Sequence, residues 1–334
     1  MLRLFDYDRL SEEMHKRGID VILAGTKPNV EYLSDFEWMR WFDKENFLTE
    51  DGKNYAAAFV GLPQDQTTGP FYVAPSTQTG YPENYNIWID DVRYWGPVFF
   101  VAGAEEQMKT ADNPIARVAQ VLREKELDKG RIGVEWRHIK MQFAEELREF
   151  LPMATLVDAE EVLWELRMIK SEEEIGRIRR ASEITSDVIN SIYSGAAYEG
   201  MTEWDLERYL GIAFAERDSR HMWTDVGFGP KGARFAGPTD EKLRKGDILR
   251  IDASGWWNGY VSDQCRSLAW DGELSDAAKR GHAAIYRMNR ELREAVRPGV
   301  LPSDLYRLTM RLFEEEGYDS LTPQAGHSLG RVAH

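Results

Sequence analysis

The chain has 334 residues, of which 43% are hydrophobic and 12% aromatic. This length exceeds what one ordinary hydrophobic core accommodates, so two domains are expected. The formal net charge of −15 argues against nucleic acid and against an anionic membrane as partners, because both are themselves negative. The single cysteine, Cys265, excludes an internal disulfide framework and predicts a reducing, cytoplasmic environment.

The sequence contains no recognisable targeting or membrane segment. Its first ten residues, MLRLFDYDRL, include acidic residues and lack an apolar run, so they do not resemble a signal peptide. No stretch approaches the roughly 20 apolar residues that a membrane-spanning helix needs. A cytoplasmic protein is therefore expected.

The first half, residues 1–165, alternates predicted strands with predicted helices, which is typical of an α/β domain. The expected helices are residues 6–18, 114–125 and 138–150, and the expected strands are residues 21–24, 55–60, 71–74, 86–88 and 132–135. A turn is expected at residues 27–29, where proline and asparagine follow each other.

A second domain, residues 166–334, is expected to open with a new helix. Ser171 and Glu174 have the spacing of a capping box, and an apolar stripe of helical period follows them. The further expected helices are residues 202–217 with Thr202 as N-cap, residues 275–296, and residues 303–316 with Ser303 as N-cap and Gly317 beyond the end.

Between these helices, residues 247–268 (DILRIDASGWWNGYVSDQCRSL) predict two strands and a tight turn. A two-residue turn of Trp257 and Asn258 would place Asp252 directly opposite Asp263, with Cβ atoms about 4.5–5.5 Å apart. Two carboxylates at that distance repel each other unless one is protonated or a cation lies between them. Apolar neighbours on both strands favour the cation. The alternative is a solvated hairpin with incidental acidic residues.

The last stretch, GHSLGRVAH, contains two histidines, His327 and His334. His327 lies between Gly326 and Gly330, so its ring can be presented without crowding. A histidine and two aspartates form a mixed nitrogen and oxygen donor set that suits divalent Mn, Co, Fe or Zn. The alternative for His327 is a loop histidine that bonds to the backbone.

These two motifs resemble those of a known family. The hairpin is similar to Asp-x-Gly-x4-Gly-Tyr-x2-Asp-x2-Arg, with Ser254 in place of the first glycine, and the last stretch matches Gly-His-x2-Gly-x3-His. Both are motifs of the metallopeptidases with the pita-bread fold, which include prolidase, aminopeptidase P, methionine aminopeptidase and creatinase. The segments LRMIKSEEEIGRIRRAS, YEGMTEWDL and KLRKGDILRID also resemble that family's catalytic domain.

The resemblance implies a mixed α/β (α+β) fold, with a creatinase/prolidase-like N-terminal domain followed by a pita-bread catalytic domain. It implies two divalent metal ions (Mn, Co, Zn or Fe), with Asp252, Asp263 and His327 as ligands. His334 is implied as the catalytic histidine that steadies the tetrahedral intermediate. The implied reaction is hydrolysis of a small peptide, as by Xaa-Pro dipeptidase or aminopeptidase P, by a hydroxide that bridges the metals. A homodimer is expected by the same analogy.

Two departures from the family pattern matter for function. Phe235 stands where the family usually has a histidine that binds substrate, and His221 is a candidate to replace it. The family's later segment, with two glutamate ligands and the last strands of the sheet, maps onto nothing here, which implies a truncated chain with three of five ligands. Two other hypotheses stay open. One is a relative that acts on a non-peptide molecule such as creatine, an ectoine-type compound or dimethylsulfoniopropionate. The other is a catalytically inactive binding protein.

Overall fold

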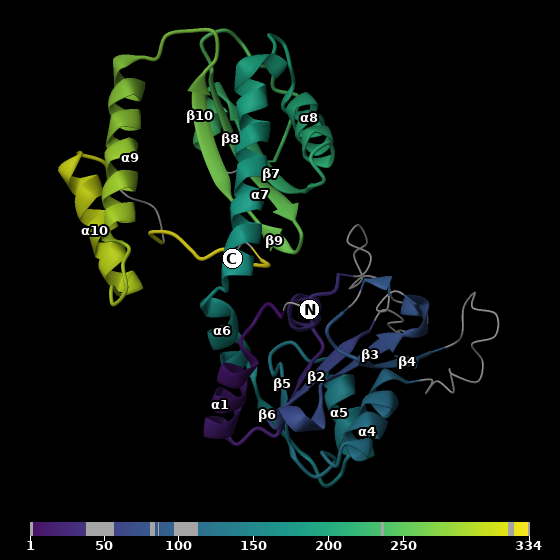
Figure 1. Ribbon diagram of the computed structural model, residues 1–334. Helices are drawn as coiled ribbons and strands as arrows, with labels where there is room; N and C mark the ends of the chain where they lie inside the picture. Colours follow the sequence, from purple (N-terminus) through teal and green to yellow (C-terminus); the bar gives the residue numbers. More distant parts are fainter. Residues whose placement is uncertain are drawn as a thin grey trace. The chain divides into compact units, whose positions relative to one another are not determined.

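The computed structural model describes residues 3–37, 57–80, 84–85, 87–96, 113–234, 237–319 and 324–332. The chain forms two compact units, Met1–Gly176 and Arg177–His334 (Figure 1). The division falls inside the helix α7 (Glu172–Ser191), whereas residue 165 lies in α6 (Glu160–Met168). Each unit contains its own sheet and its own buried hydrophobic cluster.

A six-stranded mixed sheet forms the centre of the first unit, in the order β4-β3-β2-β1-β5-β6. Its strands are β1 (Val21–Ala24), β2 (Phe59–Pro63), β3 (Phe71–Pro75), β4 (Asp91–Trp95), β5 (Arg131–Val134) and β6 (Thr155–Asp158). The helices are α1 (Tyr7–Arg17), α2 (Lys27–Ser34), α4 (Pro114–Glu124), α5 (Met141–Phe150), α6, and the short turns η2 (Gln66–Thr68) and η3 (Ser76–Gln78). The strands β1, β2 and β3 are buried along their length, which explains their continuous apolar sequences.

Most predicted elements of this unit are confirmed, but the predictions on either side of β2 and β3 need correction. Residues 27–29 begin α2 instead of forming a turn, because Pro28 lies in the first helical turn, where its missing N–H leaves no hydrogen bond unmade. Residues 87–88 of the predicted 86–88 strand are not in a strand, and β4 follows them. Residues 55, 56 and 86 lie outside the described part of the chain.

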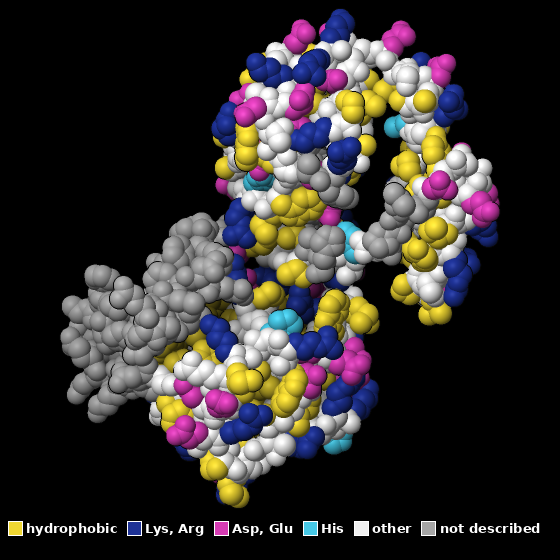
Figure 2. Space-filling view, turned by 180° about the vertical axis from the view of Figure 1, so that it is seen from behind, with side chains coloured by type: hydrophobic (Ala, Val, Ile, Leu, Met, Phe, Trp, Pro, Cys, Tyr) yellow, Lys and Arg dark blue, Asp and Glu magenta, His cyan; other side chains and the backbone are white. Residues whose placement is uncertain are grey.

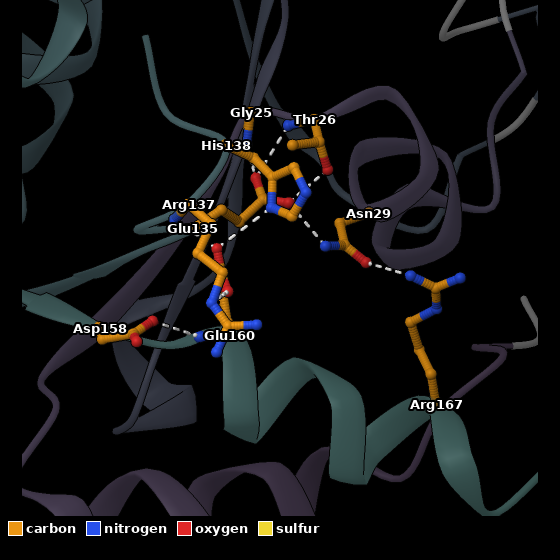
Figure 3. Close-up of polar contacts among 9 residues, drawn as sticks. All are labelled: Gly25, Thr26, Asn29, Glu135, Arg137, His138, Asp158, Glu160 and Arg167. Carbon is orange, nitrogen blue, oxygen red and sulfur yellow. Dashed lines mark hydrogen bonds and ion pairs between the residues drawn. The ribbon is translucent and has the colours of Figure 1, made fainter. Parts of the chain in front are cut away.

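A buried carboxylate ties the connection between β1 and α2 to the end of β5 (Figure 3). Glu135 is 3% exposed and accepts hydrogen bonds from the backbone N–H groups of Gly25 (2.6 Å) and Thr26 (2.8 Å). The Thr26 hydroxyl and the Asn29 amide (2.6 Å) also donate to it. The first N–H groups of a helix have no partner inside the helix, so Glu135 stabilises the start of α2. We interpret this cluster as structural.

Glu135→Ala is expected to destabilise the first unit by about 2–4 kcal/mol, because several buried donors lose a charged acceptor. Urea denaturation measures the change in the free energy of unfolding, and amide hydrogen exchange of β1 and β5 shows whether the first unit is the part that is destabilised. Glu149→Ala, at an exposed position of α5, is the matched control and should shift stability by no more than about 0.5 kcal/mol. Equal stability of the two variants would contradict the structural role of Glu135.

The second unit is built on an antiparallel sheet in the order β10-β8-β7, with β9 paired to the end of β8. Its strands are β7 (Arg220–Phe228), β8 (Ile248–Trp257), β9 (Tyr260–Val261) and β10 (Gln264–Ala269). The helices are α7, α8 (Glu203–Ala215), α9 (Asp276–Ala295), α10 (Pro302–Glu315), and the short segments η4 (Ile192–Ala196) and η5 (Gly229–Ala233).

The two faces of β8 differ in chemistry, since successive side chains of a strand point to opposite faces. Leu249, Ile251 and Ala253 lie in the hydrophobic core together with side chains of α7 and α8. Arg250 and Asp252 alternate with them and therefore share the other face. That face carries the predicted metal ligand.

The predicted starts of α7 and α8 are confirmed, whereas that of α10 is not. Ser171 and Glu174 form the reciprocal bonds of a capping box, with N···O distances of 2.8 and 3.3 Å. Thr202 caps α8, with Asp205 as its capping-box partner. Ser303 is not a cap: α10 begins at the preceding proline, whose fixed φ suits the first helical turn.

The helices α9 and α10 pack on each other and expose apolar side chains, shown in yellow in the right-hand part of Figure 2. Met288 and Leu312 are buried, whereas Ile285, Tyr286 and Tyr306 are exposed. Among the residues that the structure describes, no helix combines the length and apolar character required to cross a membrane.

Candidate metal centre

The hairpin that carries the predicted ligands turns one residue later than predicted. Its two turn residues are Asn258 and Gly259, and Trp257 pairs with Tyr260. Both turn residues have positive φ, 48° and 90° respectively. A two-residue turn with positive φ at both positions is of type I′, for which Asn-Gly is a preferred sequence. The predicted turn of Trp257 and Asn258 is therefore wrong.

The corrected register changes which side chains face Asp252. Cys265 of β10 and Asp225 of β7 lie directly opposite it, one on each neighbouring strand. Asp263 precedes Cys265 by two residues and so takes a diagonal position, where Cα atoms are typically about 7–8 Å apart. The predicted direct opposition of Asp252 and Asp263 is wrong. Burial and, after it, the Asp263 charge nevertheless raise the pKa of Asp252, so the two carboxylates are electrostatic neighbours.

The directly opposed carboxylates, Asp225 and Asp252, share an internal cation. Arg250 donates from Nη1 to Asp225 Oδ2 and from Nη2 to Asp252 Oδ2, both at 3.1 Å. Both aspartates are buried. Two close carboxylates require a neighbouring cation, and here the Arg250 guanidinium supplies part of that positive charge. Neither Asp225 nor Arg250 was predicted from the sequence as part of the site.

One oxygen of Asp252 has a different environment. Its Oδ1 is buried and has no hydrogen-bond partner among the described residues. Leaving a buried carboxylate oxygen without a donor is costly. Oδ1 is therefore a suitable position for a cation, on the face that carries Arg250.

The structure brings His327 to Asp263. His327 Nε2 lies 3.3 Å from Asp263 Oδ2, and both side chains are partly buried. His327 Nδ1 lies 3.2 Å from the backbone oxygen of Ser328, as the alternative of a backbone-bonded loop histidine also supposed. Two of the three predicted ligands are thus in direct contact, and Asp252 is an electrostatic neighbour of one of them, Asp263.

The other predicted site residues fall elsewhere. Phe235 and His334 lie outside the described residues. His221 lies in β7 opposite Gly255, so it belongs to the face that packs against α7 and α8, not to the face of Asp252. Its ring stacks on Phe214 at 5.5 Å, and burial lowers its pKa. This placement does not support the predicted contact of His221 with substrate.

A further buried carboxylate, that of Glu203, was not predicted from the sequence. It contacts Lys231 and Thr239, which precede and follow Phe235 in the sequence. Glu203 is fully buried at the start of α8. Its carboxylate pairs with Lys231 and accepts hydrogen bonds from the backbone N–H (2.9 Å) and the hydroxyl (2.7 Å) of Thr239. Its Oε1 also accepts from Phe228 N at 3.3 Å. A buried glutamate within YEGMTEWDL could have been suspected only from its position in the first turn of a helix.

Two family models together match nearly the whole chain. Residues 176–334 match metallopeptidase family M24, and residues 7–169 match the creatinase/prolidase N-terminal domain. Residues 176–334 thus belong to the M24 metallopeptidase family, behind a creatinase/prolidase N-terminal domain. This agrees with the predicted family, with the predicted class of enzyme and with the mixed α/β fold.

Similar proteins are also found among curated proteins and among solved structures. YkvY of Bacillus subtilis is 25% identical, with 98% of this chain and 82% of that protein covered. Creatinase of a Bacillus species is 26% identical, with 98% and 74% covered. The structure of an Xaa-Pro dipeptidase from Bacillus anthracis superposes with a TM-score of 0.78 at 19% identity, covering 98% of this chain and 82% of that one. At this identity the structural match shows the shared fold.

M24 metallopeptidases generally use a dinuclear divalent metal centre. The carboxylate oxygens of Asp252 and Asp263 and the imidazole nitrogen of His327 are ligand atoms that suit a divalent ion. Asp252 Oδ1 has no hydrogen-bond partner among the described residues, so it is available to coordinate a metal. Among the described residues, however, no three histidine, cysteine or acidic side chains come together as a complete cation site. The residues therefore fit part of a metal centre.

Proposed function

We propose that the chain is a metal-dependent peptidase that hydrolyses small peptides at an Xaa-Pro bond. The observation that supports this most directly is the contact of His327 with Asp263, which is itself an electrostatic neighbour of Asp252. The buried Asp252 Oδ1 without a hydrogen-bond partner and the match to the M24 family add to it. An Xaa-Pro dipeptidase of the same fold adds support for the substrate class.

The charge balance of this face favours a cation. Asp225, Asp252 and Asp263 contribute three carboxylates, and Arg250 contributes one guanidinium. If all are ionised, two negative charges remain in a partly buried region, which attracts a divalent ion. The proposed ligands are Asp252, Asp263 and His327, and two Mn, Co, Zn or Fe ions are proposed as cofactors.

The proposed roles in catalysis divide between the ligands and the substrate-binding side chains. The metal ions, when bound, polarise the scissile carbonyl and lower the pKa of a water molecule. His334 is proposed to donate a hydrogen bond to the oxygen on which negative charge develops. Phe235 is proposed to pack against the substrate, since a phenyl ring cannot donate a hydrogen bond. A homodimer and a cytoplasmic location remain proposals drawn from the family resemblance and the composition.

Metal analysis and a substrate panel test this function. After loading with Mn²⁺ or Co²⁺ and desalting, we expect at least one equivalent of metal and turnover of Xaa-Pro dipeptides. Less than about a tenth of an equivalent, in a protein whose fold is intact by circular dichroism, would exclude both metalloenzyme hypotheses and leave the inactive binding protein.

The match to creatinase favours one alternative, a non-peptide substrate. Creatine, which like a dipeptide carries a carboxylate, is therefore tested in the same substrate panel. Metal uptake with creatine turnover and no dipeptide hydrolysis would assign the chain to that alternative.

A further inference from the structure

The segment that carries His327 contacts β9 through two residues that follow the histidine, Gly330 and Arg331. The Val261 N–H donates to the Gly330 carbonyl oxygen at 3.0 Å, so one backbone hydrogen bond joins the segment to β9. The Arg331 guanidinium lies over the ring of Tyr260, with Cζ 5.5 Å from the ring centroid. That distance is within the range of a cation–π contact. The two contacts hold adjacent residues of the segment to adjacent residues of β9.

The hairpin turn is shaped to admit Arg331. A Cβ atom on Gly259 would lie 2.6 Å from Arg331 Nη1, so a larger residue would displace the guanidinium. Tyr260 is fully buried, and a second guanidinium, that of Arg177, lies 6.0 Å from its ring centroid. Arg177 also donates to the Asn258 carbonyl at 3.5 Å. The ring that receives Arg331 is therefore held in a fixed position.

His327 depends on such an anchor because it lies in a segment without helix or strand. Its 3.3 Å contact with Asp263 Oδ2 is made between two side chains and does not fix the backbone of the segment. We propose that Arg331, through its contact with Tyr260, is a positioning residue that holds the His327 imidazole at Asp263. The consequence for metal binding rests on the proposed function, whereas the anchoring itself does not.

Amide hydrogen exchange tests the anchor without metal. In Arg331→Ala, the Val261 amide is expected to exchange about tenfold faster, because its bond to Gly330 opens more often. The neighbouring Ser262 amide donates to Gly255 within the hairpin at 2.9 Å and should be unchanged. Arg331→Lys keeps a cation over the ring and should restore most of the protection. Unchanged exchange of Val261 in Arg331→Ala would overturn the proposal.

Cobalt titration then separates positioning from general stability. Arg331→Ala is expected to lower Co²⁺ affinity about 10-fold, as loss of a ligand-orienting partner commonly does. The same substitution in a His327→Ala background should have no further effect, because it acts through the imidazole. Arg311→Ala, on the exposed side of α10, is the control and should leave affinity unchanged.

An equal fall in affinity with and without His327 would show a merely structural role and overturn the proposal. If the wild-type chain binds no Co²⁺, the proposed function fails, and the exchange of Val261 still decides whether Arg331 anchors the segment.

Discussion

Asp263→Asn is expected to abolish metal-dependent hydrolysis and to weaken Mn²⁺ or Co²⁺ binding about 100-fold or more. The substitution removes a full negative charge, and an amide presents only one oxygen to a cation. It also removes the carboxylate that contacts His327, so that two donors are perturbed together. Isothermal titration with each metal, paired with a dipeptide assay, measures both effects.

Two companion variants make this result specific. His334→Ala should slow turnover while metal is retained, since that histidine is proposed to act on the substrate. Asp271→Asn changes an exposed aspartate that pairs with Lys245 and should leave both metal and activity unchanged. Equal loss of metal in Asp263→Asn and His334→Ala would contradict the proposed division of roles.

Glu203→Ala is expected to destabilise the second unit by about 3–5 kcal/mol, because it breaks a buried ion pair by removing one partner. Lys231 and the Thr239 N–H would lose their common acceptor. Differential scanning calorimetry and urea titration measure the loss. Glu199→Ala, at an exposed position just before α8, is the control and should remain within about 0.5 kcal/mol.

Glu203→Gln distinguishes the charge from the hydrogen bonds. Glutamine can still accept from Thr239 but cannot neutralise Lys231, so an intermediate stability is expected. Because Phe235 lies between the two anchored residues in sequence, a rise in KM larger than the change in kcat is also expected. Wild-type stability of Glu203→Ala would refute the anchoring role.

The sequence predicted features that depend on residues close together in the chain. The capping boxes at Ser171 and Thr202 are confirmed because such a box needs only residues three apart. The pairing of His327 with Asp263 was anticipated only through the family motif, since 64 positions separate the two residues.

Sheet register was the main source of error. Moving the turn by one residue changed the residue opposite Asp252 from Asp263 to Cys265. Because the strand β7 was not predicted, Asp225 could not be placed opposite Asp252. The ion pairs of Arg250 with both aspartates could therefore not be predicted either. Such contacts arise from pairing between distant strands, which no local pattern specifies.

The turn that sets this register is also a site where the hairpin can be modified chemically, by deamidation of Asn258. Asn258 and Gly259 form the only Asn-Gly pair in the sequence, and Asn258 is exposed. Asparagine is a thermolabile residue. In such a pair the backbone nitrogen of glycine can attack Cγ of asparagine and expel the side-chain nitrogen as ammonia, and one water molecule then opens the succinimide to aspartate or isoaspartate. Isoaspartate lengthens the backbone by a methylene group at a two-residue turn, directly before Tyr260. Prolonged storage at alkaline pH would therefore alter the hairpin covalently, and with it the support for His327.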